Sequence, residues 1–100
     1  MITIKELENN IGNWLVNFDS KSKLRTIQKI NEVIPQKYEG FIINGPVMEF
    51  WDLEIRIYKN SHSRRYFSSE LSRDYNRIMT EEELKDKIGK IIYGSLNFKL

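Results

Sequence analysis

The stretch LEIRIYKNSHSRRYFSSEL, Leu53 to Leu71, changes character in its middle. Its first part alternates apolar and polar residues, which is typical of a β-strand with one buried face. Its second part is polar, basic and rich in serine, and it contains the only histidine of the chain. The pattern predicts two neighbouring strands joined by a polar connection, in which the aromatic segment Arg65 to Ser69 returns beside the strand that contains Leu53. This stretch therefore predicts a β-sheet in the middle of the chain.

A β-hairpin is expected to include the same strand. An apolar strand beginning at Tyr38 is followed by the turn residues Asn44-Gly-Pro46 and then by an extended run from Val47 to Tyr58. Residues two apart in a strand share a face. The buried face is predicted to hold Trp51, Leu53, Ile55 and Ile57, and the exposed face Asp52, Glu54, Arg56 and Tyr58.

The N-terminal third of the chain has helical spacing. Thr3-Ile-Lys-Glu6 has the Ser/Thr-x-x-Glu spacing of a capping box, in which the two side chains satisfy free backbone amides of the first turn. Apolar residues then recur at steps of three and four as far as Phe18. The same spacing returns from Leu24 to Ile34, where Pro35 ends it. These patterns predict two helices joined by a short polar link.

A last helix is predicted near the C-terminus. Thr80-Glu-Glu-Glu83 is a second capping box, and an apolar stripe follows it, formed by Leu84, Ile88, Ile91, Ile92 and Leu96. The preceding segment, Asp74 to Met79, is compatible with a short fourth strand or with an irregular approach to the helix. The elements together predict an α+β fold in the order ααβββ(β)α, with the helices on one face of a small antiparallel sheet.

Composition and charge narrow the classes of function. The 100 residues are 40% hydrophobic, enough for one core, so we expect a single domain over residues 1–100. The chain has no cysteine, which excludes disulfides and thiolate metal sites. A net charge of +2 gives little attraction of the whole molecule to nucleic acid or to an acidic membrane. The lack of a long apolar run predicts a soluble cytoplasmic protein with no membrane partner.

Basic and aromatic residues gather between Lys59 and Arg77. Five Lys and Arg residues stand there against two acidic ones, with Tyr66, Phe67 and Tyr75 among them. Such residues can bind phosphates and stack on bases, although the aromatic rings could equally point into the core and the arginines pair with nearby acids. The predicted partner-binding residues are Lys59, His62, Arg64, Arg65, Tyr66, Arg73 and Arg77, and the second candidate surface is Asp52, Glu54, Arg56 and Tyr58.

Catalytic patterns are weak in this chain. With one histidine and no cysteine, paired metal ligands of these types are absent, and no Ser-His-Asp order surrounds His62. The series Asp52-x-Glu54-x-Arg56 is similar to the acids with which some nucleases hold a divalent cation. Alternating charges on a strand are also the ordinary pattern of cross-strand ion pairs. We therefore expect no catalytic residue, metal or cofactor, and keep a metal-dependent nuclease as an alternative.

The order of elements in the second half of the chain is a strand, the turn Asn60-Ser-His62-Ser, a short return strand and the acid-capped helix. This order resembles a family of small phage and mobile-element proteins. The family has an IR-[IL]-S-N-H-S turn and includes an anti-CRISPR type that inhibits Cas9. The resemblance spans Leu53 to Ile92. It implies a small non-enzymatic inhibitor of a host defence or replication protein. The main prediction is thus a binding protein that docks on a larger protein or nucleoprotein complex, with a direct nucleic-acid-binding module as the alternative.

Overall fold

The structure, a computed structural model, describes residues 1–38, 40–50, 54–58, 62–67 and 70–89. Ten strands and two helices lie in these ranges. The described chain is mostly β, so the predicted α+β order ααβββ(β)α is wrong. The elements are β1 (Ile2–Thr3), α1 (Ile4–Glu8), β2 (Trp14–Phe18), β3 (Leu24–Lys29), β4 (Glu32–Pro35), β5 (Phe41–Asn44), β6 (Val47–Phe50), β7 (Ile55–Tyr58), β8 (Ser63–Tyr66), β9 (Glu70–Leu71), β10 (Asn76–Met79) and α2 (Glu81–Ile88).

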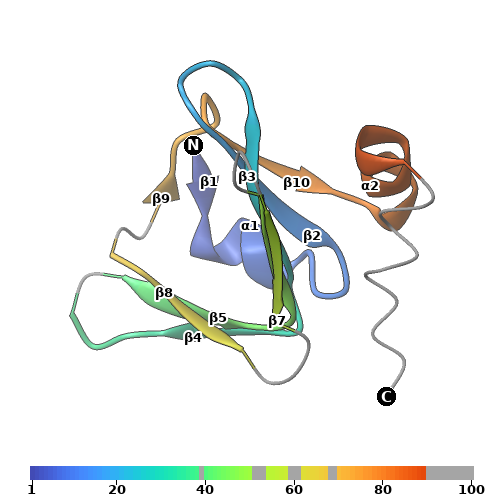
Figure 1. Cartoon of the computed structure of the whole chain (residues 1–100). Coiled ribbons are helices and arrows are strands. Elements are labelled where there is room, and N and C mark those ends of the chain that lie inside the picture. The colour runs from blue at the N-terminus through green and yellow to red at the C-terminus, as the bar shows by residue number, and fades with distance from the viewer. Residues whose placement is uncertain (39, 51–53, 59–61, 68–69, 90–100) are drawn as a thin grey trace.

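Two antiparallel sheets meet at a corner (Figure 1). One has the strand order β10-β2-β3-β6-β7, the other has the order β4-β5-β8, and β1 pairs separately with β9. Backbone pairing continues through the corner, because Lys29 N donates to Pro46 O and Asn31 N donates to Asn44 O, each at 3.0 Å. The segments β3–β4 and β5–β6 are therefore two long strands that bend together from one sheet into the other, as in orthogonally packed sheets.

The segment Asn44-Gly45-Pro46 is this corner, and the predicted hairpin turn is wrong. β5 pairs with β4 and β8, whereas β6 pairs with β3 and β7. A Cβ atom on Gly45 would lie 1.8 Å from the carbonyl oxygen of Lys29, so glycine permits the close approach of the two bent strands. The return strand, β8, also differs from expectation, since it pairs with β5 and not with β7.

The two predicted N-terminal helices are replaced by one short helix and three strands. α1 ends at Glu8, and Gly12, with a φ of 93°, lies in the turn before β2. Residues 24–35 form β3 and β4. The helical spacing arose because these strands bury side chains on both faces, as when Val16 of β2 joins one core cluster and Leu15 the other. A strand covered on both faces loses the alternation that distinguishes it from a helix.

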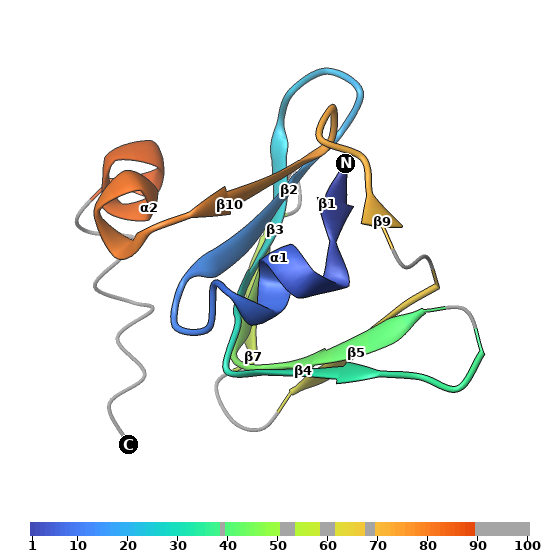
Figure 2. The same ribbon diagram turned by 180° about the vertical axis from the view of Figure 1, so that it is seen from behind.

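Two core clusters lie on opposite faces of the five-stranded sheet. The inner core, which includes Leu7 of α1, lies between the two sheets, and α1 occupies the space that they enclose (Figure 2). The outer core lies beneath α2, which contributes Leu84 and Ile88. The inner core consists of Ile2, Leu7, Leu15, Ile30, Phe41 and Ile43, and the outer core of Trp14, Val16, Ile27, Met48, Leu84 and Ile88.

Both predicted helix starts are confirmed. Thr80 Oγ1 accepts from Glu83 N at 3.3 Å and Glu83 Oε1 accepts from Thr80 N at 3.2 Å, which completes the capping box. Thr3 Oγ1 accepts from Glu6 N at 3.1 Å. Leu84 and Ile88 are buried as expected, while Ile91, Ile92 and Leu96 lie outside the described residues. The open question about residues 74–79 is resolved, because β10 pairs with β2.

The predicted burial of Ile55 and Ile57 on β7 is wrong. These side chains are 48% and 37% exposed, because β7 is at one end of the five-stranded sheet whereas α2 packs near β10 at the other. Glu54 and Arg56 are exposed as expected. Trp51, Asp52 and Leu53 lie outside the described residues. In the ranges that the structure describes, neither helix is long and apolar enough to cross a membrane.

Candidate functional site

One face of the β4-β5-β8 sheet is turned away from the inner core. Strand pairing places Ile34 opposite Ile42, and Ile42 opposite Arg65, so the three residues lie side by side across the sheet. Ile34 is 37% exposed, and Phe67, directly after β8, is 74% exposed. Neither isoleucine belongs to a core cluster. We call the surface formed by Ile34, Ile42, Arg65 and Phe67 the outer face.

Cations and aromatic rings border this outer face. The guanidinium carbon of Arg65 lies 5.4 Å from the centroid of the Phe67 ring, within cation–π range. In the β4–β5 turn, Lys37 Nζ lies 5.9 Å from the centroid of the exposed Tyr38 ring. A Cβ atom on Gly40 would lie 3.1 Å from the Cα of Phe67, so this turn passes directly beside Phe67. Both cation–π pairs therefore lie toward the same end of the three-stranded sheet.

The other end of the outer face is a polar row across the same strands. Asn44 Nδ2 donates to Glu32 Oε1 at 2.6 Å, and Ser63 Oγ donates to Asn44 Oδ1. The Glu32 carboxylate is thus already hydrogen-bonded within the sheet. The outer face consequently offers apolar groups and the positive charge of Arg65 to a partner.

Tyr66 lies on the opposite side of β8 from Arg65. Its ring stacks on Phe41 with the centroids 5.1 Å apart, and its hydroxyl donates to Gln28 Oε1 at 3.0 Å. Gln28 is buried, and its Nε2 donates to Ile43 O at 2.8 Å. Burial raises the pKa of Tyr66 to about 12. Tyr66 therefore packs against the inner core, and Arg64, two residues earlier, points to the same side of the strand.

The second candidate surface has paired side chains. Arg56 Nη2 lies 2.7 Å from Glu54 Oε1, and this carboxylate raises the pKa of the Arg56 guanidinium. The rings of Tyr58 and His62 stack with centroids 4.9 Å apart. Lys59 and Asp52 lie outside the described residues. Among the residues that are described, no group of three His, Asp or Glu side chains could hold a metal ion.

Two of the predicted arginines lie away from β8. Arg73 pairs with Glu6 of α1, with Nη2 2.6 Å from Oε2. Arg77 on β10 lines a pocket beside α2. The structure thus groups Arg64, Arg65 and Tyr66 on one strand and places Arg73 and Arg77 at two other positions.

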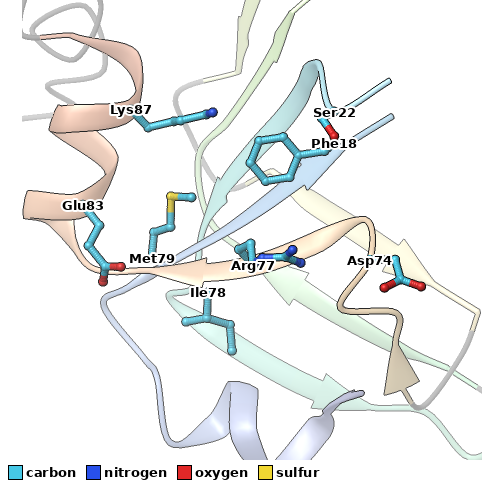
Figure 3. Close-up of a pocket in the computed structure, with 8 residues that line it drawn as sticks. All are labelled: Phe18, Ser22, Asp74, Arg77, Ile78, Met79, Glu83 and Lys87. Carbon is cyan, nitrogen blue, oxygen red and sulfur yellow. The ribbon is translucent and has the colours of Figure 1, made fainter. Parts of the chain in front are cut away.

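The pocket beside α2 has a volume of about 310 Å³ (Figure 3). Three parts of the chain surround it: the end of β2 with the turn that follows it, β10 with Asp74 just before it, and α2. Of the residues that line the pocket, the sequence analysis named only Arg77 as a binding residue, from the basic and aromatic composition around it. The other lining residues were missed because side chains from three separate elements converge only after folding. The lining residues are Phe18, Ser22, Asp74, Arg77, Ile78, Met79, Glu83 and Lys87.

No protein-family model, curated protein or solved structure matches this chain.

Proposed function

We propose that this protein is a small non-catalytic binding protein that docks on a larger protein, alone or within a nucleoprotein complex, through the outer face. The carrying observation is the exposed pair Arg65 and Phe67 beside the cross-strand neighbours Ile34 and Ile42. Arginines and aromatic residues beside apolar groups are enriched among residues that dominate interface energies. Ile34, Ile42 and Arg65 lie on paired strands, whose fixed backbone lowers the entropy cost of binding.

The charge of the outer face favours an acidic, partly apolar protein surface as the partner. Within the described residues, Arg65 forms no ion pair, whereas Glu32 is hydrogen-bonded to Asn44. Partner carboxylates beside an apolar patch would complement this arrangement. Binding through nucleic-acid phosphates would require several cations, and Arg65 and Lys37 are few for that purpose. The same geometry therefore favours protein over nucleic acid.

The resemblance to anti-CRISPR proteins adds the proposal that docking inhibits the partner. A domain of this size can block a larger protein by covering its working surface, without chemistry of its own. This addition is tested separately, by measuring the activity of a captured partner with and without the protein.

The docking proposal is tested with two matched double variants of the full chain. Arg65→Ala with Phe67→Ala removes one positive charge and one apolar group from the outer face. Arg56→Ala with Ile55→Ala removes the same two kinds of group from β7, where both residues are exposed. Each variant and the wild type are used to capture partners from an extract of the native host, before and after nuclease treatment.

The proposal expects a specific protein whose binding survives nuclease treatment and weakens about tenfold or more in the outer-face variant alone, as for central interface residues. Equal capture by both variants would refute docking through this face. Loss of capture after nuclease treatment, with salt-sensitive binding to oligonucleotides, would support the nucleic-acid alternative. Magnesium-dependent degradation of a nucleic acid would support the nuclease alternative.

A further inference from the structure

The pocket beside α2 has an apolar wall that is held in place by the outer core. Phe18 at the end of β2 and Met79 at the end of β10 both pack against that core. Their partly buried positions restrict how far they can move. A preformed apolar wall next to an aromatic ring suits a flat apolar group, since such groups stack on rings and fill narrow spaces.

Two cations reach the pocket from different elements. Lys87 Nζ, from α2, lies 5.2 Å from the centroid of the Phe18 ring. Arg77 Nη1 donates to Asn76 O at 2.8 Å, which orients the guanidinium and leaves its other N–H groups available. Figure 3 shows Lys87 and Arg77 extending toward the pocket from α2 and β10, with Phe18 and Met79 between the two elements. An anionic group in the pocket could interact with both cations.

The acidic residues of the pocket form no ion pairs with these cations in the described part of the chain. Glu83 Oε1 accepts hydrogen bonds from Thr80 N and Thr80 Oγ1, at 3.2 Å and 3.1 Å, so this carboxylate is engaged at the start of α2. Asp74 is the other acid in the lining. Within the described residues, neither Arg77 nor Lys87 forms an ion pair with Asp74 or Glu83. The four charges of the lining sum to zero, because hydrogen bonds from Thr80 leave the negative charge of Glu83 in place, but neither cation is held by an ion pair within the lining and both can reach an anionic ligand.

From this arrangement we infer that the pocket is a binding site for a small aromatic acid, a ligand that joins one planar ring to a phosphate or carboxylate. The ring would lie against Phe18 and Met79, and the acid between Arg77 and Lys87. A volume of about 310 Å³ is at the lower end of the range for ligand pockets and suits one ring with one acidic group. The site is separate from the outer face and does not depend on the docking proposal.

The test measures binding of three probes to the full chain by calorimetry and by amide chemical shifts. Phenyl phosphate carries the ring and the acid, inorganic phosphate carries the acid alone, and cyclohexyl phosphate replaces the flat ring by a bulkier, non-aromatic one. We expect saturable binding of phenyl phosphate, at least about tenfold tighter than that of either other phosphate, with shifts at Phe18, Arg77 and Lys87. Binding of all three phosphates with equal affinity would overturn the inferred role of the aromatic wall.

Two variants and one control locate the binding. Arg77→Ala with Lys87→Ala should weaken phenyl phosphate binding about tenfold or more. The control, Lys5→Ala with Lys37→Ala, removes the same charge from exposed positions outside the pocket and should leave affinity unchanged. Asp74→Asn removes one of the two negative charges of the lining and should tighten binding of phenyl phosphate severalfold. A misfolded variant would lose affinity and would not show this gain. Unchanged affinity in both pocket variants, or an equal loss in the control, would overturn the inference.

Discussion

The two sheets differ in what lies on their outward sides. On the five-stranded sheet, Val16, Ile27 and Met48 are buried together with Leu84 and Ile88 of α2. On the three-stranded sheet, Ile34 and Ile42 lie in a row with Arg65 and belong to neither core. Burial of apolar groups stabilises a fold, whereas the same groups on an uncovered face contribute less and are available to a partner. The comparison teaches that one kind of residue serves stability in one sheet and can serve recognition in the other.

The difference between the two sheets is tested most directly by truncating one apolar side chain on the outward side of each sheet. Leu84→Ala should lower the free energy of unfolding by about 2 to 5 kcal/mol, because Leu84 is fully buried and its loss leaves a cavity. Ile34→Ala should cost less than about 1 kcal/mol, because Ile34 is 37% exposed. Urea denaturation of both variants measures the two values. Equal losses would mean that both outward sides are covered alike.

Alkaline titration tests whether the inner side of the three-stranded sheet is packed, in contrast to its outer face. The pKa of Tyr66 is raised to about 12 by burial, so the folded state binds this proton more tightly than the unfolded state does. This difference in proton binding contributes roughly 2 to 3 kcal/mol to the free energy of unfolding. The contribution is fully present below a pH of about 10 and is lost as the pH rises through about 12. The wild type should therefore lose stability relative to Tyr66→Phe over this interval. A Tyr66 phenol that ionises together with exposed tyrosines in the ultraviolet difference spectrum would contradict the packing.

The corner between the two sheets is tested at Gly45. Alanine there would bring a Cβ atom to 1.8 Å from a backbone oxygen that has no flexible end to move aside. Gly45→Ala should cost more than about 1 kcal/mol, since the substituted residue no longer fits the native backbone. Gly12→Ala gives a comparison, because a Cβ atom on Gly12 would meet no atom within 4 Å, although its φ of 93° disfavours alanine. A Gly45→Ala variant with wild-type stability would show that the strands do not pass this closely.

The smallest expected effect concerns the helix that covers the five-stranded sheet. Thr80→Ala removes both hydrogen bonds of Thr80 Oγ1 with Glu83 and should cost about 1 kcal/mol. Thr80→Ser retains a hydroxyl and serves as the control. An unchanged denaturation midpoint for Thr80→Ala would indicate that α2 is held by Leu84 and Ile88 alone.

The candidate site could be predicted in part. The basic and aromatic composition around β8 indicated Arg65, but composition did not reveal that Tyr66 and Arg64 point to the side opposite Arg65. Ile34 and Ile42 were assigned to a helix and to a hairpin strand, so their meeting on one face was missed. No sequence signal joins Phe18, Arg77 and Lys87, because they come from three elements.

The amino-acid sequence by itself determined the features that depend on a few neighbouring residues. Thr3 and Thr80 begin helices because a threonine oxygen and an amide three residues later need no distant partner. The tertiary structure decided where α1 ends, which strands pair and where they bend. Trp14 and Leu15 illustrate the reason: each is buried, but in a different core, so their spacing alone could not distinguish a helix from a strand covered on both sides. The two sides of β2 are covered by α2 on one side and by α1 and the second sheet on the other. These contacts exist only after segments that are distant in the sequence have come together.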